Sequence, residues 1–181
     1  MAILESKGGD LNRSYEISKL CPTGVYPARC IDILDSMDVE EPSFDDPTVM
    51  VTKNKTKFLF SVKAGEETEL VQTFEFNISG SPKSSLWKFI KAWLGKAPAP
   101  AFDTLNLIGQ ACQLTIDNRT SKKGTAYATV ESIAPLMDPS QAPAVDAVEV
   151  PGGPRADITV ETPSTPASDG NGNAGSQKDP F

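Results

Sequence analysis

The sequence predicts an all-β domain with a single helix, followed by a flexible tail. Residues 57–63 and 70–79 alternate apolar and polar side chains, as strands with one buried face do. Residues 112–117 and 125–133 repeat this pattern on either side of a basic, glycine-containing turn, which predicts a second hairpin. Between the two pairs, residues 82–94 place large apolar side chains at helical spacing, so one helix separates them.

The remaining elements follow in chain order. Residues 1–21 form a polar lead-in, and residues 22–24 a turn. Residues 25–34 predict a strand whose imperfect alternation requires a bulge. Residues 35–47 are acidic and interrupted by proline, which predicts a long loop, with a strand extension at its start as the open alternative. Ser81 is expected to cap the helix, Pro82 to begin it and Gly95 to end it.

The element order is therefore three strands, one helix and two strands. This is the order of a five-stranded OB-fold barrel, in which one helix lies between strands three and four. We assign this domain to residues 22–138, although other small split barrels share the pattern.

Residues 139–181 have the composition of a disordered segment. They are rich in Pro, Gly, Ser, Ala and Asn, and Phe181 is their only aromatic residue. They carry two basic and six acidic residues, so they hold −4 of the net charge of −7. We expect a flexible acidic C-terminal tail that presents one ring at its end.

Composition argues against an enzyme. The chain contains no histidine, which removes the commonest general base and metal ligand. Its three cysteines lack metal-binding spacing and are expected to be buried free thiols. The carboxylates of residues 35–46 lie in the predicted loop, so a solvated loop is favoured over a two-metal nuclease site. We expect no cofactor, no metal site, no signal peptide and no membrane span.

Several basic and aromatic residues are candidates for binding single-stranded nucleic acid. Phosphates require cations, and unpaired bases stack on exposed rings. The basic turn at residues 119–124 lies where OB-folds frequently contact nucleic acid, the alternative being an ordinary solvated turn. A lysine cluster precedes and enters the strand at residues 57–63, and the four phenylalanines of residues 58–76 are expected in the core. The candidate DNA-binding residues are Tyr26, Arg29, Lys53, Lys55, Lys57, Lys63, Arg119, Lys122, Lys123 and Tyr127.

A family resemblance covers most of residues 22–136. Residues 107–114 read L-I-G-x-x-C-x-L, residues 122–127 read K-x-G-x-x-Y, and residues 133–135 read I-x-P. This block resembles one in phage-encoded OB-fold proteins of replication and recombination modules, and the preceding helix and the opening strand are similar to theirs. The ending Asp179, Pro180 and Phe181 resembles the C-terminal tip of bacterial single-stranded DNA-binding proteins.

The resemblance implies a protein that binds single-stranded DNA without sequence preference during phage replication or recombination. It would act in the cytoplasm of a bacterial host and recruit replication or recombination proteins through its C-terminal tip. Surplus apolar helix surface suggests a homodimer. The alternative is an OB-type protein-interaction module or host-factor inhibitor that does not bind DNA. A groove lined by lysines favours the first interpretation, and one lined by residues 35–47 favours the second.

Overall fold

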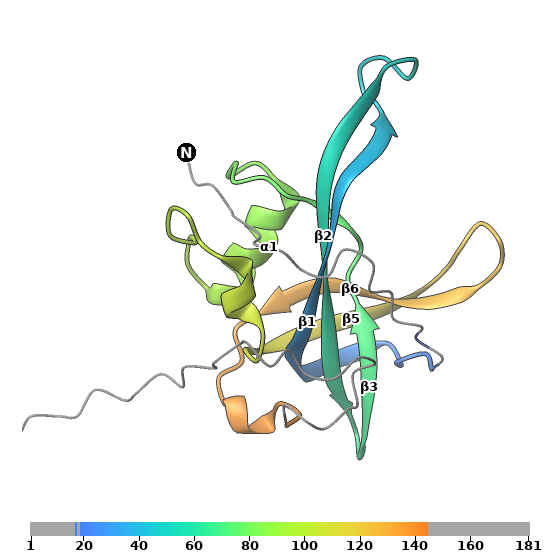
Figure 1. The fold of residues 1–181 in the computed structure, drawn as a ribbon. Helices are drawn as coiled ribbons and strands as arrows, with labels where there is room; N and C mark the ends of the chain where they lie inside the picture. Colours follow the sequence, from blue (N-terminus) through green and yellow to red (C-terminus); the bar gives the residue numbers. More distant parts are fainter. Residues whose placement is uncertain (1–16, 18, 145–181) are drawn as a thin grey trace, which may run out of the picture.

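The computed structural model describes residue 17 and residues 19–144, and it is built mainly from antiparallel strands (Figure 1). Most of the lead-in expected at residues 1–21 and of the tail expected at residues 139–181 lies outside the described residues. The strands are β1 (Gly24–Pro42), β2 (Met50–Ala64), β3 (Glu67–Gln72), β4 (Phe76–Asn77), β5 (Ala111–Thr120) and β6 (Ala126–Ala134). One α-helix, α1 (Ser85–Leu94), and two short 3₁₀ turns, η1 (Thr104–Leu107) and η2 (Pro139–Gln141), complete them.

The strands form one sheet in the order β3-β2-β1-β5-β6, with β4 paired to β2. Every pairing is antiparallel. The two ends of this order, β3 and β6, nevertheless lie close together. The expectation of an all-β domain with one helix is confirmed at this level.

The first strand corrects the prediction of a loop at residues 35–47. β1 continues to Pro42 and pairs with β2 as far as Met50, forming a long two-stranded hairpin that projects from the body (Figure 1). We call residues 35–57 the arm. Two register shifts interrupt the pairing, and Asp38 within the second has a φ of 54° and donates its backbone N–H to Asn54 Oδ1 at 2.9 Å. Beyond the buried pair Asp35 and Thr56, the residues of the arm are half-buried or exposed, so the arm lacks hydrophobic alternation and periodicity could not reveal it.

Two further element boundaries differ from the prediction. The strand expected at residues 70–79 is divided into β3 and β4. The helix begins after Ser84, whose Oγ accepts the backbone N–H of Trp87 at 3.1 Å, so Ser84 and not Ser81 is the N-cap. Gly95 ends the helix in the left-handed conformation with a φ of 70°, as predicted.

The main core lies between the sheet and α1. Phe58, Phe60 and Phe76 are buried there with Trp93, whose indole N–H donates to the carbonyl of Ala111 at 3.2 Å. Phe74 was expected to join them but is 55% exposed, and it lies in the segment between β3 and β4 rather than in a strand. The other face of the sheet carries a smaller apolar cluster formed by Leu34 and Leu59 with Ile17, Ile31 and Leu70.

The three cysteines are buried free thiols, as predicted. Desolvation raises the pKa of Cys30 and of Cys112, and burial likewise raises that of Cys21. All three thiols therefore remain protonated near neutral pH and serve as small apolar packing groups.

Residues 139–144 contact the domain, although the sequence placed them in the tail. The Arg29 guanidinium donates to the carbonyls of Pro143 at 2.6 Å, Gly109 at 2.7 Å and Pro139 at 3.5 Å. Arg29 thus joins this segment to the turn before β5. Among the described residues, no helix has the length and apolarity needed to cross a bilayer.

Candidate nucleic-acid interface

A groove of about 340 Å³ lies where β3 and β6 face one another. The end of β3 and the segment that follows it line one side, the start of β6 lines the other, and Ile17, Lys19 and Leu20 contribute to the wall. Three large apolar side chains of this lining are unusually exposed: Leu20 at 41%, Phe74 at 55% and Tyr127 at 45%. We call this feature the seam groove. The lining residues are Ile17, Lys19, Leu20, Leu70, Val71, Gln72, Thr73, Phe74, Ala126, Tyr127, Ala128 and Thr129.

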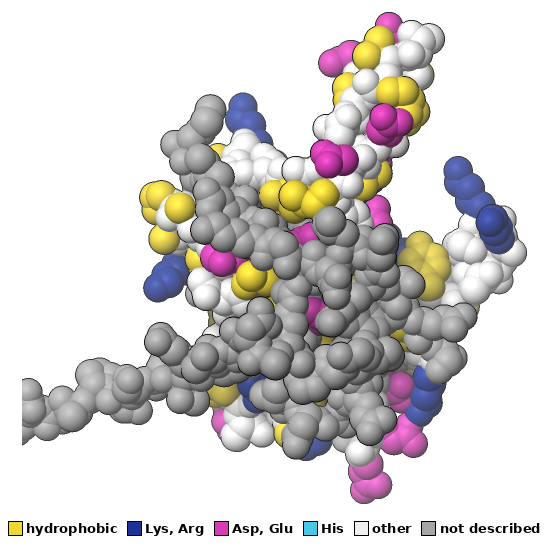
Figure 2. Space-filling view, in the orientation of Figure 1, with side chains coloured by type: hydrophobic (Ala, Val, Ile, Leu, Met, Phe, Trp, Pro, Cys, Tyr) yellow, Lys and Arg dark blue, Asp and Glu magenta, His cyan; other side chains and the backbone are white. Residues whose placement is uncertain are grey.

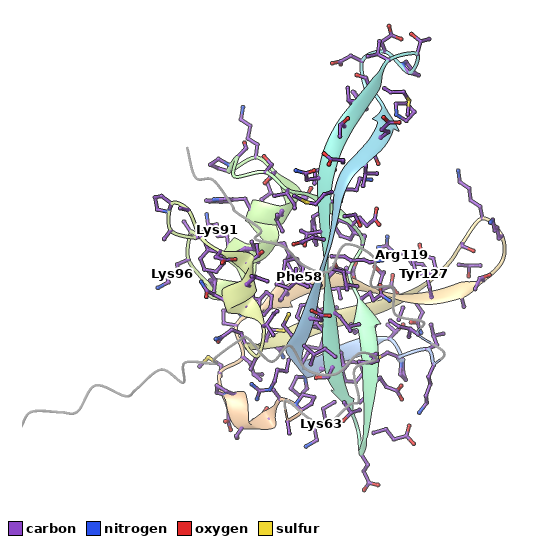
Figure 3. All side chains as sticks on the ribbon, in the orientation of Figure 1. Phe58, Lys63, Lys91, Lys96, Arg119 and Tyr127 are labelled. Carbon is purple, nitrogen blue, oxygen red and sulfur yellow. The ribbon has the colours of Figure 1, made fainter. Side chains whose placement is uncertain are left out.

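Two half-exposed aromatic rings line the seam groove. The Phe74 ring packs against the buried Phe76 ring, with centroids 4.3 Å apart. Tyr127 lies directly across the β5–β6 ladder from Arg119, and Figure 3 shows the two side by side. A half-exposed ring can accept a base against its open face.

The hairpin of β5 and β6 carries an exposed basic tip. The Ser121 backbone N–H donates to the Thr125 carbonyl at 2.9 Å, and the Gly124 N–H donates to the Ser121 carbonyl at 2.9 Å. Gly124 has a φ of 82°, which glycine adopts without strain. Lys122 and Lys123 are exposed in this turn, and the hairpin projects away from the sheet with basic side chains at its end (Figure 2).

The tip of the β5–β6 hairpin carries only positive charge. Residues 118–130 contain Arg119, Lys122 and Lys123 and no acidic residue. The Arg119 Nε lies 3.4 Å from Asp117 Oδ2, but both side chains are well exposed, so solvent screens this pair and leaves Arg119 available. Because interactions between exposed charges decay over about 8–10 Å at moderate salt, this tip is cationic despite the acidic chain.

The lysines of the arm are differently situated. Lys55 contacts Glu41 closely and lies 3.6 Å from Glu75, while Lys53 Nζ lies 3.5 Å from Glu41 Oε2. The hydrogen bond from Lys55 lowers the pKa of Glu41, and the same bond raises the pKa of Lys55. Both groups are therefore charged near neutral pH, and Glu41 neutralises much of the field that the two lysines would offer to a phosphate.

Lys57 and Lys63 share one face of β2, but the structure does not bring them to the basic hairpin. Lys57 is half-buried opposite Leu34. Lys63 is exposed near the turn into β3, at the far end of the sheet from the arm (Figure 3). They flank the sheet face that carries the small apolar cluster rather than forming a continuous basic stripe.

Tyr26 and Arg29 are built into the fold. The Tyr26 ring lies over Gly24, so that a Cβ atom at Gly24 would come within 2.8 Å of the phenol oxygen. The Tyr26 hydroxyl donates to the Thr23 carbonyl at 3.4 Å. Arg29 donates to the three carbonyls described above. Both residues support the surfaces around β1 rather than offering free groups to a ligand.

Two residues of the seam groove escaped the sequence analysis. Phe74 was assigned to the core because it alternates with Phe76, yet β3 ends at Gln72 and β4 begins at Phe76, so Phe74 lies outside both strands and the alternation no longer reports burial. Lys19 lies in the expected lead-in and forms ion pairs with Glu67 and, at 2.6 Å, with Glu69. Hydrogen bonds to these carboxylates raise the pKa of Lys19. No sequence signal available here would have identified it.

The other predicted sites are not placed by the structure. Asp179, Pro180 and Phe181 lie outside the described residues. Within residues 17 and 19–144, no group of three or more acidic or cysteine side chains could hold a metal ion. Comparisons of the chain with protein-family models, with curated proteins and with solved structures found no match.

Proposed function

We propose that the chain is a single-stranded DNA-binding protein of the OB-fold type. The observation that carries the proposal is the pair of exposed rings, Phe74 and Tyr127, in a groove beside a basic hairpin. Stacking on such rings is tolerant of sequence because every base has a flat face, and the cations of the hairpin would neutralise the backbone between bases.

The strand order supports the OB-fold part of the proposal. We assign β1 and β2 to the first two barrel strands, β3 with β4 to the third, and β5 and β6 to the last two, with α1 between the third and fourth. The pairing of β1 with both β2 and β5 joins the first strand to the second and fourth, as that topology requires. The barrel would close where β3 and β6 approach one another, which is the position of the seam groove.

The absence of the acidic residues 35–47 from the groove lining favours DNA over the alternative of a protein-interaction module. The seam groove is lined by residues of β3 and β6, by Thr73 and Phe74, and by Ile17, Lys19 and Leu20, and none of residues 35–47 belongs to its lining. The acidic arm is the feature that favours the alternative, because it presents carboxylates away from the groove. An inhibitor acting through the arm would bind a basic protein and leave oligonucleotides unbound.

The test is a fluorescence-anisotropy titration with labelled oligo-dT and with duplex DNA, repeated across salt concentrations. We expect oligo-dT to bind, the duplex to bind much more weakly, and the logarithm of the affinity to fall linearly with the logarithm of the salt concentration. Absence of oligo-dT binding in dilute buffer would reject the proposal. Equal affinity for both forms would reject its specificity for unpaired strands.

The phage context and the role of the tail extend this proposal. Action in phage replication or recombination, in the cytoplasm of a bacterial host, rests on the resemblance at residues 107–135. Recruitment of replication or recombination proteins through Asp179, Pro180 and Phe181 rests on the resemblance of those residues to the bacterial tip. Deleting residues 170–181 is expected to leave oligo-dT affinity intact or tighter and to abolish partner capture. Loss of oligo-dT binding in that variant would contradict this role.

A further inference from the structure

The tip of the arm presents an apolar and acidic surface that is not used by the candidate DNA site. Phe44 is 97% exposed, and Val49 and Met50 beside it are about half exposed. Residues 36–52 contain five acidic residues and no basic one. A tip of this kind can bury its ring only in a partner, and it would select an apolar hollow with a basic rim.

The conformation of the tip is fixed before any partner binds. The Ser43 backbone N–H donates to the Val49 carbonyl at 2.7 Å, and the Val49 N–H donates to the Asp46 carbonyl at 3.0 Å. Asp46 Oδ1 also accepts the backbone N–H of Thr48 at 2.9 Å and its hydroxyl at 2.6 Å. A preorganised loop loses little entropy on docking, so a small contact can be productive.

The complementary surface lies on α1. Residues 76–102 contain four lysines and no acidic residue, which makes them a strongly basic stretch of an acidic chain. An open hollow of about 450 Å³ on this surface is lined by Pro82, Trp87, Lys88, Lys91, Ala92 and Gly95. The Lys91 Nζ lies 5.4 Å from the Trp87 ring centroid. An aromatic ring could pack against Trp87 while the neighbouring carboxylates face Lys88 and Lys91.

The arm cannot deliver its tip to the helix of the same molecule. Figure 1 shows the arm extending away from the body, whereas α1 covers the sheet itself. The two strands of the arm pair on both sides of the register shift at Ser36 and Val39, and this pairing resists folding back. The occupant of the hollow must therefore come from another molecule.

We propose that the arm tip of one copy docks Phe44, Asp45 and Asp46 into the Trp87 hollow of a second copy. This contact is heterologous: the arm tip of one copy meets the helix surface of the next. The contact between a hairpin tip and a single helix buries little surface area. We therefore expect a weak, transient association with a Kd roughly in the micromolar to millimolar range. The proposal does not rest on DNA binding and is tested without DNA.

The experiment is sedimentation velocity of the full chain over concentration, with a charge-swap design. The two reversal variants are Asp45→Lys with Asp46→Lys and Lys88→Glu with Lys91→Glu. Each alone should weaken self-association by at least about tenfold. Their equimolar mixture should associate again, because the unchanged acidic tip of one variant meets the unchanged basic hollow of the other, and the lysine-bearing tip meets the glutamate-bearing hollow. The matched control for the tip variant, Glu66→Lys with Glu131→Lys, changes the net charge by the same amount at exposed sites and should associate as the wild type does.

A second readout follows Trp87 directly. Trp93 is buried, so acrylamide quenching of tryptophan fluorescence should report chiefly on Trp87. Quenching should decrease as the protein concentration rises, and Phe44→Ser should remove this change. A wild-type chain that stays monomeric to about 1 mM would overturn the proposal. A mixture of the two reversal variants that stays monomeric would also overturn it. Self-association that persists in each reversal variant and is lost on deletion of residues 170–181 would do the same.

Discussion

The two long hairpins of this molecule have the same secondary structure and opposite electrostatic character. The arm, formed by β1 and β2, contains Lys53 and Lys55, but both lie against Glu41. The β5–β6 hairpin contains Lys122 and Lys123 in an exposed turn with no acidic residue in residues 118–130. A count of lysines along the sequence treats the two hairpins alike, whereas the residues across each ladder decide which cations can meet a phosphate.

The largest expected effect concerns the rings beside the basic hairpin. Replacing Phe74 and Tyr127 together by alanine should remove two stacking surfaces, each contributing roughly 1–3 kcal/mol to oligo-dT binding. Tyr127→Phe should retain affinity because the flat face remains. The matched change on the arm, Phe44→Ala, should leave affinity unchanged in anisotropy titrations at nanomolar protein. An equal loss from Phe44→Ala would remove the distinction between the hairpins.

Arg29 is a cation with a structural role, so its replacement should affect stability and not DNA affinity. Arg29→Gln leaves the carbonyls of Gly109, Pro139 and Pro143 without their donor. We expect the free energy of unfolding to fall by about 1–3 kcal/mol. Urea denaturation followed by tryptophan fluorescence measures this change. Oligo-dT affinity of the folded variant should match that of the wild type, and a selective loss of affinity would instead place Arg29 in the DNA site.

Matched lysine pairs test the comparison most simply. Lys122→Gln with Lys123→Gln should weaken oligo-dT binding about tenfold at low salt and should reduce the salt slope by about 1.4, or about 0.7 per lost phosphate contact. Lys53→Gln with Lys55→Gln removes the same charge from the arm and should change neither quantity appreciably. If the arm pair had the larger effect, DNA would lie along the arm.

The smallest expected effect comes from releasing the arm lysines. Glu41→Gln removes the carboxylate that Lys53 and Lys55 share. Oligo-dT affinity should then increase by about twofold, because the charges of the two lysines are no longer neutralised but still lie away from the groove. Acid acts in the same direction. The lowered pKa of Glu41 means that its ion pairs persist above the ordinary glutamate pKa and are lost as pH falls through the folded value. NMR titration of the Glu41 carboxyl carbon should show this lowered pKa, and an ordinary value would contradict the pairing.

The buried thiols give a separate dependence on pH. Their raised pKa values favour the protonated form in the folded chain, so their stabilisation is complete below the unfolded thiol pKa of about 8.5 and decreases as pH rises above it. Urea unfolding at increasing alkaline pH should show this loss. Cys112→Ala should reduce the dependence, and an unchanged dependence in that variant would assign it to other groups.

The sequence predicted the paired strands and the helix because their core faces are periodic. Phe58, Phe60 and Val62 alternate and are buried, and Gly95 ends the helix as expected. The arm was anticipated only as an alternative strand extension, because beyond Asp35 and Thr56 its residues are exposed or half-buried and form no periodic apolar face. The exposure of Phe74 was missed because a break between β3 and β4 ends the alternation. The seam groove depends on β3 and β6, which are far apart in the sequence, so no local pattern could reveal it.

The measurement that tests the central claim most directly is ultraviolet crosslinking of the full chain to oligo-dT, with the crosslinked peptides identified by mass spectrometry. We predict that crosslinks occur at Phe74 and Tyr127 and in the turn that carries Lys122 and Lys123. Crosslinks confined to residues 35–57, or none under conditions where an established single-stranded DNA-binding protein crosslinks, would contradict the account.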